Sequence, residues 1–179
     1  MSYRQWIVAL FVGVCGLFVL QSTALAQDGG DYPSNEGMSI GAFIGYDIDI
    51  LEEAFIGLDA RFGFDLPDVA PGFGIVVNPA LNYYLISGGT FLQADGNVLA
   101  QYKLANEAAL YGGIGLALFI ASDDFGTETD LNFNTLILGG SYPFSDDFRG
   151  FGQLRLTRFG GDFFSFTTMG VMVGASFGM

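Results

Sequence analysis

The feature that most constrains this chain is a regular alternation of apolar and polar residues in one segment after another. Between Thr90 and Lys103, one parity carries apolar side chains and the other carries mostly polar or charged ones. Successive side chains of a β-strand point to opposite faces, so a period of two predicts a strand with two unlike faces. The fold then depends on which face is hidden, and on whether protein or lipid hides it.

Eight such segments follow one another between turn signals, and no helical periodicity is found after residue 26. In the sixth segment Leu136 and Leu138 share the parity of the polar residues Asn132 and Asn134, so we expect a β-bulge that restores the phase. Pro79 lies inside the third segment and has no N–H for the ladder, so we expect a bulge or distortion there. The expected strands are 38–47, 54–64, 74–85, 90–103, 109–120, 131–144, 149–159 and 164–179.

The first 26 residues have the three parts of a secretory signal peptide. A charged residue precedes an apolar run over residues 7–20, which is shorter than the roughly 20 residues that a spanning helix needs. The small residues of Ala-Leu-Ala at 24–26 then provide a cleavage site. We therefore expect a signal peptide over residues 1–26, a flexible segment over 27–37 and one domain over 38–179. The only cysteine, Cys15, lies in the signal, so no disulfide is expected in the exported chain.

Charge and composition exclude several functions. Asp and Glu outnumber Lys and Arg by 19 to 6, which excludes nucleic acid as an expected partner. There is no histidine, so Ser-His-Asp hydrolysis and most zinc chemistry are excluded. The glycines between Gly112 and Leu118 lack the spacing of a phosphate-binding loop and lie in an expected strand. We therefore expect no catalytic residue, no cofactor and no enzymatic activity.

Two dense runs of carboxylates lie in the expected connections between strands. Oxygen ligands at this density are the kind that Ca²⁺ and Mg²⁺ use, but neither run has the spacing of an EF-hand loop. The expectation is a pair of solvated acidic loops, and a divalent-cation site is the alternative. The residues are Asp47, Asp49, Glu52 and Glu53 in the first run, and Asp123, Asp124, Glu128 and Asp130 in the second.

The charged residues within the strands favour a confined interior on the polar face. They are few, they include both signs, and they alternate with small residues such as Gly41. An eight-stranded barrel is only wide enough inside to be filled by side chains, so small residues must alternate with polar ones that reach across it. An unpaired charge there would be costly to desolvate, so we expect the charges to pair across the lumen, for example Asp59 with Arg155. The lumen charge network is expected to contain Asp59, Arg61, Asp95 and Arg155.

The opposite face is bulky, apolar and almost free of charge, with Arg158 as the chief exception. A soluble lipocalin-like barrel or sandwich would bury this face and carry abundant Lys and Glu on the other, whereas a membrane barrel turns it outward to lipid. Aromatic residues near the strand ends, among them Tyr46, Phe64 and Phe159, are typical of interfacial girdles. The sequence therefore predicts an all-β fold, an eight-stranded antiparallel up-and-down transmembrane β-barrel.

The sequence after residue 26 resembles the family of small outer-membrane β-barrels that includes OmpA-, OmpX- and OmpW-like proteins. The most specific match is the C-terminal segment VMVGASFGM, which alternates as a family assembly signal does but ends in methionine where an aromatic residue is usual. Its residues in phase are Val171, Val173, Ala175, Phe177 and Met179. The resemblance implies an outer-membrane location, contact with lipid, recognition by the barrel-assembly machinery and a monomeric state.

Three functions remain open at this point. The first is an integral outer-membrane barrel with a side-chain-filled lumen and a structural or surface-interaction role. The second is a small porin-like channel, which the glycine-rich interior favours and pairing across the lumen opposes. The third is a soluble lipocalin-like binder of apolar ligands.

Overall fold

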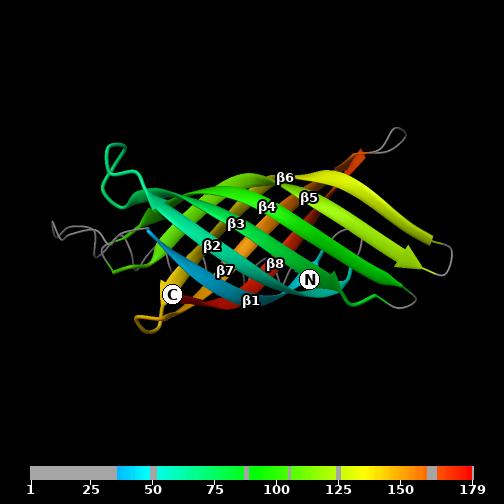
Figure 1. The fold of residues 1–179 in the computed structure, drawn as a ribbon, viewed down its shortest axis with the longest axis horizontal. Helices are drawn as coiled ribbons and strands as arrows, with labels where there is room; N and C mark the ends of the chain where they lie inside the picture. Colours follow the sequence, from blue (N-terminus) through cyan, green and yellow to red (C-terminus); the bar gives the residue numbers. More distant parts are fainter. Residues whose placement is uncertain are drawn as a thin grey trace, which may run out of the picture.

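Eight antiparallel β-strands close into a barrel (Figure 1). The computed structural model describes residues 36–48, 52–86, 89–104, 106–123, 126–160 and 165–178. Each strand pairs with its sequence neighbours, and the last pairs with the first, which confirms the predicted eight-stranded antiparallel up-and-down topology. The strands are β1 (Gly37–Asp47), β2 (Ala54–Asp65), β3 (Phe73–Tyr84), β4 (Thr90–Lys103), β5 (Ala109–Asp123), β6 (Gly126–Pro143), β7 (Phe148–Gly160) and β8 (Ser165–Gly178).

The barrel has two ends, which we name the base and the top. The base is the end at which β1 begins and β8 ends, and the connections β2–β3, β4–β5 and β6–β7 also lie there. The top carries the other four connections. The expected signal peptide and most of the segment 27–37 lie outside the described residues, as do Asp49, Asp124 and Met179. No helix in the part of the chain that the structure describes is long and apolar enough to cross a membrane.

The two faces of the sheet are opposite in polarity to those of a water-soluble barrel. The polar parity points into the lumen, where Asn82, Gln93 and Asn134 are completely buried. The apolar parity points outward and is exposed on seven of the eight described strands, while on β7 Leu154 and Leu156 are partly exposed. Examples of these outward residues are Ile44, Leu58, Leu81, Val98, Ile114, Phe133, Leu138 and Val173.

The two expected irregularities have different outcomes. The pairing of β6 with β7 changes register between Asn134 and Leu136, which confirms the bulge and leaves Leu136 outward while Ile137 turns into the lumen. Around Pro79 the pairing of β2 with β3 is interrupted, but the same register resumes on both sides, so the distortion is present without a bulge. The carbonyl of Ala60, which faces Pro79 across the strands, accepts from the side-chain amide of Asn78 at 3.0 Å.

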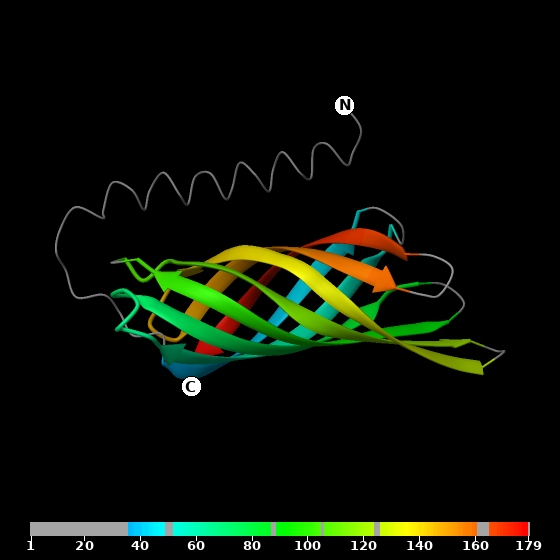
Figure 2. The ribbon, with the colours of Figure 1, turned by 90° about the horizontal axis from the view of Figure 1, so that it is seen from above.

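The strands β5 and β6 are longer than the sequence predicts. The sequence predicts a connection over residues 121–130, whereas these residues largely continue the two strands. Glu128 and Asp130 therefore lie on β6 and not in a loop, so this part of the acidic-loop prediction is wrong. The physical reason is that Thr127 and Thr129 alternate with them and extend the ladder against β5. The resulting hairpin reaches past the ends of β7 and β8 (Figures 1 and 2).

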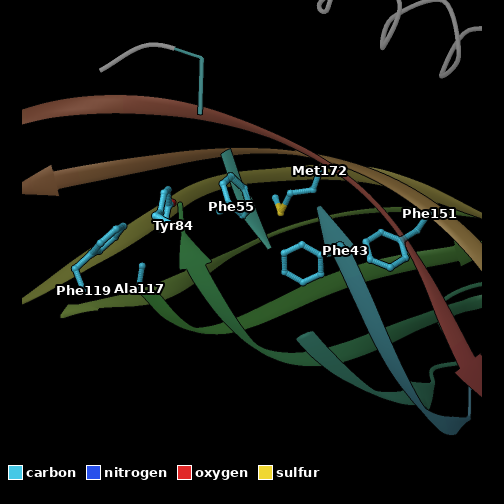
Figure 3. Close-up of a cluster of buried hydrophobic side chains, with 7 residues drawn as sticks. All are labelled: Phe43, Phe55, Tyr84, Ala117, Phe119, Phe151 and Met172. Carbon is cyan, nitrogen blue, oxygen red and sulfur yellow. The ribbon is translucent and has the colours of Figure 1, made fainter. Parts of the chain in front are cut away.

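Aromatic side chains form a continuous line that runs through the lumen to its opening at the top. Figure 3 shows part of this line, with Phe119 and Phe151 at its two ends. Consecutive ring centroids lie 4.5 to 6.4 Å apart, so each ring packs against the next and together they fill the part of the lumen through which the line runs. Phe159 belongs to the line, which corrects its expected place in an outward girdle, because a strand-end residue of the lumen parity points inward. The aromatic chain, as we name it, consists of Phe151, Phe43, Phe55, Tyr84, Phe91, Phe119, Phe159 and Phe166.

Candidate functional site

The first ion pair in the lumen joins two residues of the same strand. Asp59 and Arg61 lie two positions apart on β2, so both side chains point inward. The Arg61 Nε donates to Asp59 Oδ2 over 2.9 Å. The guanidinium carbon lies 4.3 Å from the ring centroid of Phe151 and 5.0 Å from that of Tyr111, within the range of cation–π contacts. Arg61 is therefore held by one carboxylate and two rings, and its bulk occupies the lumen on the base side.

The second ion pair spans the lumen between strands that are not neighbours. The Arg155 Nη1 on β7 donates to Asp95 Oδ2 on β4 over 2.6 Å, and the two side chains are 3% and 1% exposed. The Asp95 carboxylate also accepts from Asn82 Nδ2 at 2.7 Å, Gln93 Nε2 at 2.6 Å and Asn134 Nδ2 at 2.9 Å. A buried carboxylate with this many donors is fully compensated for the water it has lost.

Side-chain amides connect the two ion pairs. Asn78 Nδ2 donates to Asp59 Oδ2 at 3.0 Å, and Asn78 Oδ1 accepts from Asn97 at 3.4 Å. Asn134 then donates to Asn97 Oδ1 at 3.0 Å as well as to Asp95. The result is one continuous set of hydrogen bonds, which we name the central network. Its members are Tyr111, Arg61, Asp59, Asn78, Asn97, Asn134, Thr157, Asp95, Asn82, Gln93, Tyr84 and Arg155.

The structure brings all four sequence-predicted lumen charges together, but with other partners than the expected example. Asp59 pairs with Arg61 on its own strand, and Arg155 pairs with Asp95. Sequence reasoning missed the asparagines as the connection between the pairs. The signal was present, since Asn78, Asn82, Asn97 and Asn134 all fall on the lumen parity, but their mutual register cannot be read from one sequence.

A glycine makes room for the central network. A Cβ atom on Gly41 would lie 2.2 Å from Asp59 Oδ1, well inside van der Waals contact. Gly41 faces Asp59 directly in the register of β1 and β2. The carboxylate therefore occupies the space that any other residue at this position would fill, which agrees with the alternation of small and polar residues in a narrow barrel.

The lumen is open to a polar recess at the base. This recess has a volume of about 350 Å³ and takes its lining from the base ends of several strands. Arg61 lies at the boundary between the recess and the central network. The lining includes Ser39, Arg61, Gln101, Lys103, Arg149 and Ser176.

The predicted carboxylate clusters are only partly described. Asp47 is buried at the top end of β1, whereas Glu128 and Asp130 are exposed on the projecting part of β6. Asp49 and Asp124 lie outside the described residues, as does the side chain of Asp123. Among the described residues, no group of three or more His, Cys, Asp or Glu is arranged to hold a metal ion. Glu52 and Glu53 follow β1, and Glu52 has a φ of 51°.

The C-terminal strand presents its predicted apolar residues outward. Val173 and Phe177 are more than half exposed, and Val171 and Ala175 share their face of β8. The ring centroid of Phe177 lies 5.1 Å from that of Phe148. Further ring contacts join Phe148 to Phe144 and Phe144 to Tyr142, so these four rings form a row at the base.

Comparison with known proteins gives a result at the level of the fold. No family model and no curated protein matches the sequence. Among solved structures, Neisserial surface protein A matches with a TM-score of 0.55 at 14% identity, over 80% of this chain and 97% of that one. The N-terminal β-barrel domain of Pseudomonas aeruginosa OprF matches with a TM-score of 0.55 at 13% identity, over 82% and 98%. The chain has the fold of the small outer-membrane β-barrels.

A further match of the same kind is a protein from Yersinia pestis. Its attachment invasion locus protein, Ail, in complex with the heparin analogue sucrose octasulfate, matches with a TM-score of 0.51 at 17% identity, over 80% of this chain and 99% of that one. At this identity the likeness concerns the fold, and the roles of individual residues must come from this chain.

Proposed function

We propose that this chain is an integral outer-membrane β-barrel protein without enzymatic activity, whose lumen is filled by its own side chains. The observation that carries the proposal is the inverted polarity of the sheet, with apolar side chains outward and amides and ion pairs inside. In water this surface would expose apolar side chains over the whole wall, whereas lipid accommodates it without cost. The closed ladder leaves no strand edge between β1 and β8 to be satisfied within the bilayer.

The proposed orientation places the base in the periplasm and the top outside the cell. The base carries the start of β1 and the end of β8, and the top carries the long β5–β6 hairpin (Figure 2). An exposed hairpin that reaches beyond the membrane supports a role in surface interaction. Its exposed Glu128 and Asp130 would repel a polyanion, so we propose that the surface partner differs in charge from the sucrose octasulfate bound by Ail.

The same placement gives the C-terminal strand a role in assembly. We propose that the outward residues of β8 are read by the barrel-assembly machinery, and that the finished barrel is a monomer surrounded by lipid. The exposure of Val173 and Phe177 on one face supports a recognition surface that is complete in one strand. Whether the acidic runs at the top hold Ca²⁺ or Mg²⁺ stays a prediction, and a calcium titration of the refolded barrel tests it.

A small channel is the second candidate, because the recess at the base already opens part of the lumen. Conductance through a planar bilayer separates the two candidates, after a heat-dependent shift in gel mobility has shown that the protein is folded. We expect no conductance steps, because the central network and the aromatic chain occupy the lumen beyond Arg61. Discrete conductance steps would favour the channel. Recovery of the protein from the soluble periplasmic fraction would contradict both the filled membrane barrel and the channel.

A further inference from the structure

The outer wall of the barrel carries one basic side chain beside an apolar hollow near the top. We propose that Arg158 and this hollow bind a membrane lipid of net negative charge, with its phosphate on the guanidinium and part of an acyl chain in the hollow. The inference rests on the proposed membrane location and adds a specific lipid site to it.

Arg158 stands out among the residues on the outward face. Of the strand residues whose side chains are described, it is the only charged one on the outward parity. The other basic residues of the described barrel, Arg61, Lys103, Arg149 and Arg155, line the lumen or the recess at the base. The ion pairs of the described residues do not include Arg158. A cation on a lipid-facing wall is more unfavourable the deeper it lies in the membrane. An anion bound beside Arg158 would offset this cost.

The position of Arg158 along the barrel is that of a membrane interface. It lies two residues before the end of β7, at the level where the pairing of β6 with β7 ends at Phe133. From there β6 continues with β5 beyond β7 and β8, and the two pairs of strands separate at their ends (Figures 1 and 2). Exposed Phe133 and Leu131 mark this level as apolar wall. A headgroup phosphate above the acyl region would meet the guanidinium here.

The hollow lies where β6 departs from β7. The bulge on β6 lies next to this point on the base side, and Thr135 at the bulge donates its hydroxyl to the carbonyl of Leu156 at 3.3 Å. The hollow has a volume of about 540 Å³, and its lining is mainly apolar. Its lining residues include Ile114, Leu131, Phe133, Thr135, Arg158 and Gly160. An apolar groove with a single cation at one side matches a ligand with an apolar tail and an anionic head.

The chemistry around Arg158 fits a phosphate. A guanidinium presents two parallel N–H donors that match two phosphate oxygens. Thr167 on β8 lies directly opposite Arg158 in the register and is exposed, so its hydroxyl adds a donor on the same face. Both groups lie outside the hollow's apolar part, which keeps the head and tail of the lipid apart.

Native mass spectrometry of the refolded barrel in micelles that contain phosphatidylglycerol or phosphatidylcholine tests the proposal. We expect the wild type to retain phosphatidylglycerol about tenfold more strongly than phosphatidylcholine, a difference of about 1.4 kcal/mol. Arg158→Gln should abolish this preference. Arg149→Gln is the matched control, because it removes the same charge at the base and should leave the preference unchanged.

Three outcomes would overturn the inference. The first is equal retention of the two lipids by the wild type, and the second is an unchanged preference in Arg158→Gln. The third is full displacement of phosphatidylglycerol by millimolar inorganic phosphate, which would mean a free-phosphate site. If Arg158→Gln does not fold, Arg158→Lys in the same assay decides. Lysine keeps the charge but lacks the two parallel N–H donors of the guanidinium, so it should reduce the preference for phosphatidylglycerol without abolishing it. A barrel that fails to insert into liposomes would instead contradict the proposed membrane function.

Discussion

Arg155 and Asp95 meet across the lumen, with 2.6 Å between Nη1 and Oδ2, although their strands β7 and β4 are separated by two others. The hydrogen bond therefore ties opposite walls of the barrel together. Both side chains are buried, and each offsets the desolvation of the other. Tyr84 adds a bond from the aromatic chain, since Arg155 Nη2 lies 3.3 Å from its hydroxyl.

Removal of one partner should leave a buried charge uncompensated. We expect Asp95→Leu to lower the free energy of unfolding by about 3–5 kcal/mol, measured by urea titration of the barrel in lipid vesicles. The double variant Asp95→Leu/Arg155→Met should recover part of this loss, because both charges are gone. Glu107→Gln is the control, since its pair with Arg149 at the base is 3.9 Å long and more exposed, and about 0–1 kcal/mol is expected. Wild-type stability of Asp95→Leu would show that the pair is not needed.

Two glycines of neighbouring strands give a matched test of packing. A Cβ atom on Gly113 would lie 2.1 Å from the backbone oxygen of Val98, whereas one on Gly96 would have no neighbour within 4 Å. Because backbone cannot move aside, we expect Gly113→Ala to lower the free energy of unfolding by at least about 1–3 kcal/mol. Gly96→Ala should leave the urea midpoint near that of the wild type. Equal midpoints for the two variants would contradict this account of the lumen.

Deletion of Thr135 should be tolerated. Thr135 is the additional residue of β6 at the bulge and has no partner in the register with β7. Its removal gives a regular ladder in which Asn134 still points into the lumen and Leu136 points outward. The heat-dependent gel shift should persist, and Leu138→Cys in this background should still react with a maleimide from outside the barrel. Deletion of Leu116, in a regular part of β5, should prevent folding because it inverts the faces of the strand beyond it. A folded Leu116 deletion would count against the register.

The C-terminal strand gives a test that separates assembly from stability. Phe177→Ala should reduce the amount of folded barrel in the outer membrane of cells, while refolding of the purified protein in detergent stays close to wild type. Phe64→Ala is the control, because Phe64 is an outward aromatic residue of β2 with similar exposure, 54% against 58%. If both variants assemble equally well in cells, Phe177 has no special role in recognition.

The alternation of side chains was enough to predict the barrel, because the period of two and the polarity of each face are local properties of the chain. The bulge near Leu136 followed from the same pattern, since a shift of phase needs one additional residue. The effect of Pro79 was harder to predict, because the compensating bond from Asn78 to the Ala60 carbonyl depends on the neighbouring strand. The length of β6 exceeds the prediction because its acidic residues alternate with threonines on a strand and do not mark a loop.

The partners inside the lumen were less predictable than the lumen itself. Parity places four charged residues on the inner face, namely Asp59, Arg61, Asp95 and Arg155. Their positions along the barrel axis depend on the tilt and stagger of the strands, which no single segment encodes. Phe159 is a different case, because its parity on β7 already places it on the lumen face, and its position near a strand end does not make it an outward girdle residue. Register is a property of pairs of strands, so a sequence read one segment at a time does not contain it.

The junction between β1 and β8 determines the order in which this protein can be completed. One edge of β1 pairs with β8, through Ser39 to Asp47 on β1 and Gly170 to Gly178 on β8. The hydrogen bonds of this edge can therefore form only after β8 is present. In the proposed membrane barrel, β1 has an open edge that lipid cannot satisfy until β8 is in place. Insertion is therefore coupled to closure, and a chain truncated before β8 would have no stable intermediate form in the bilayer.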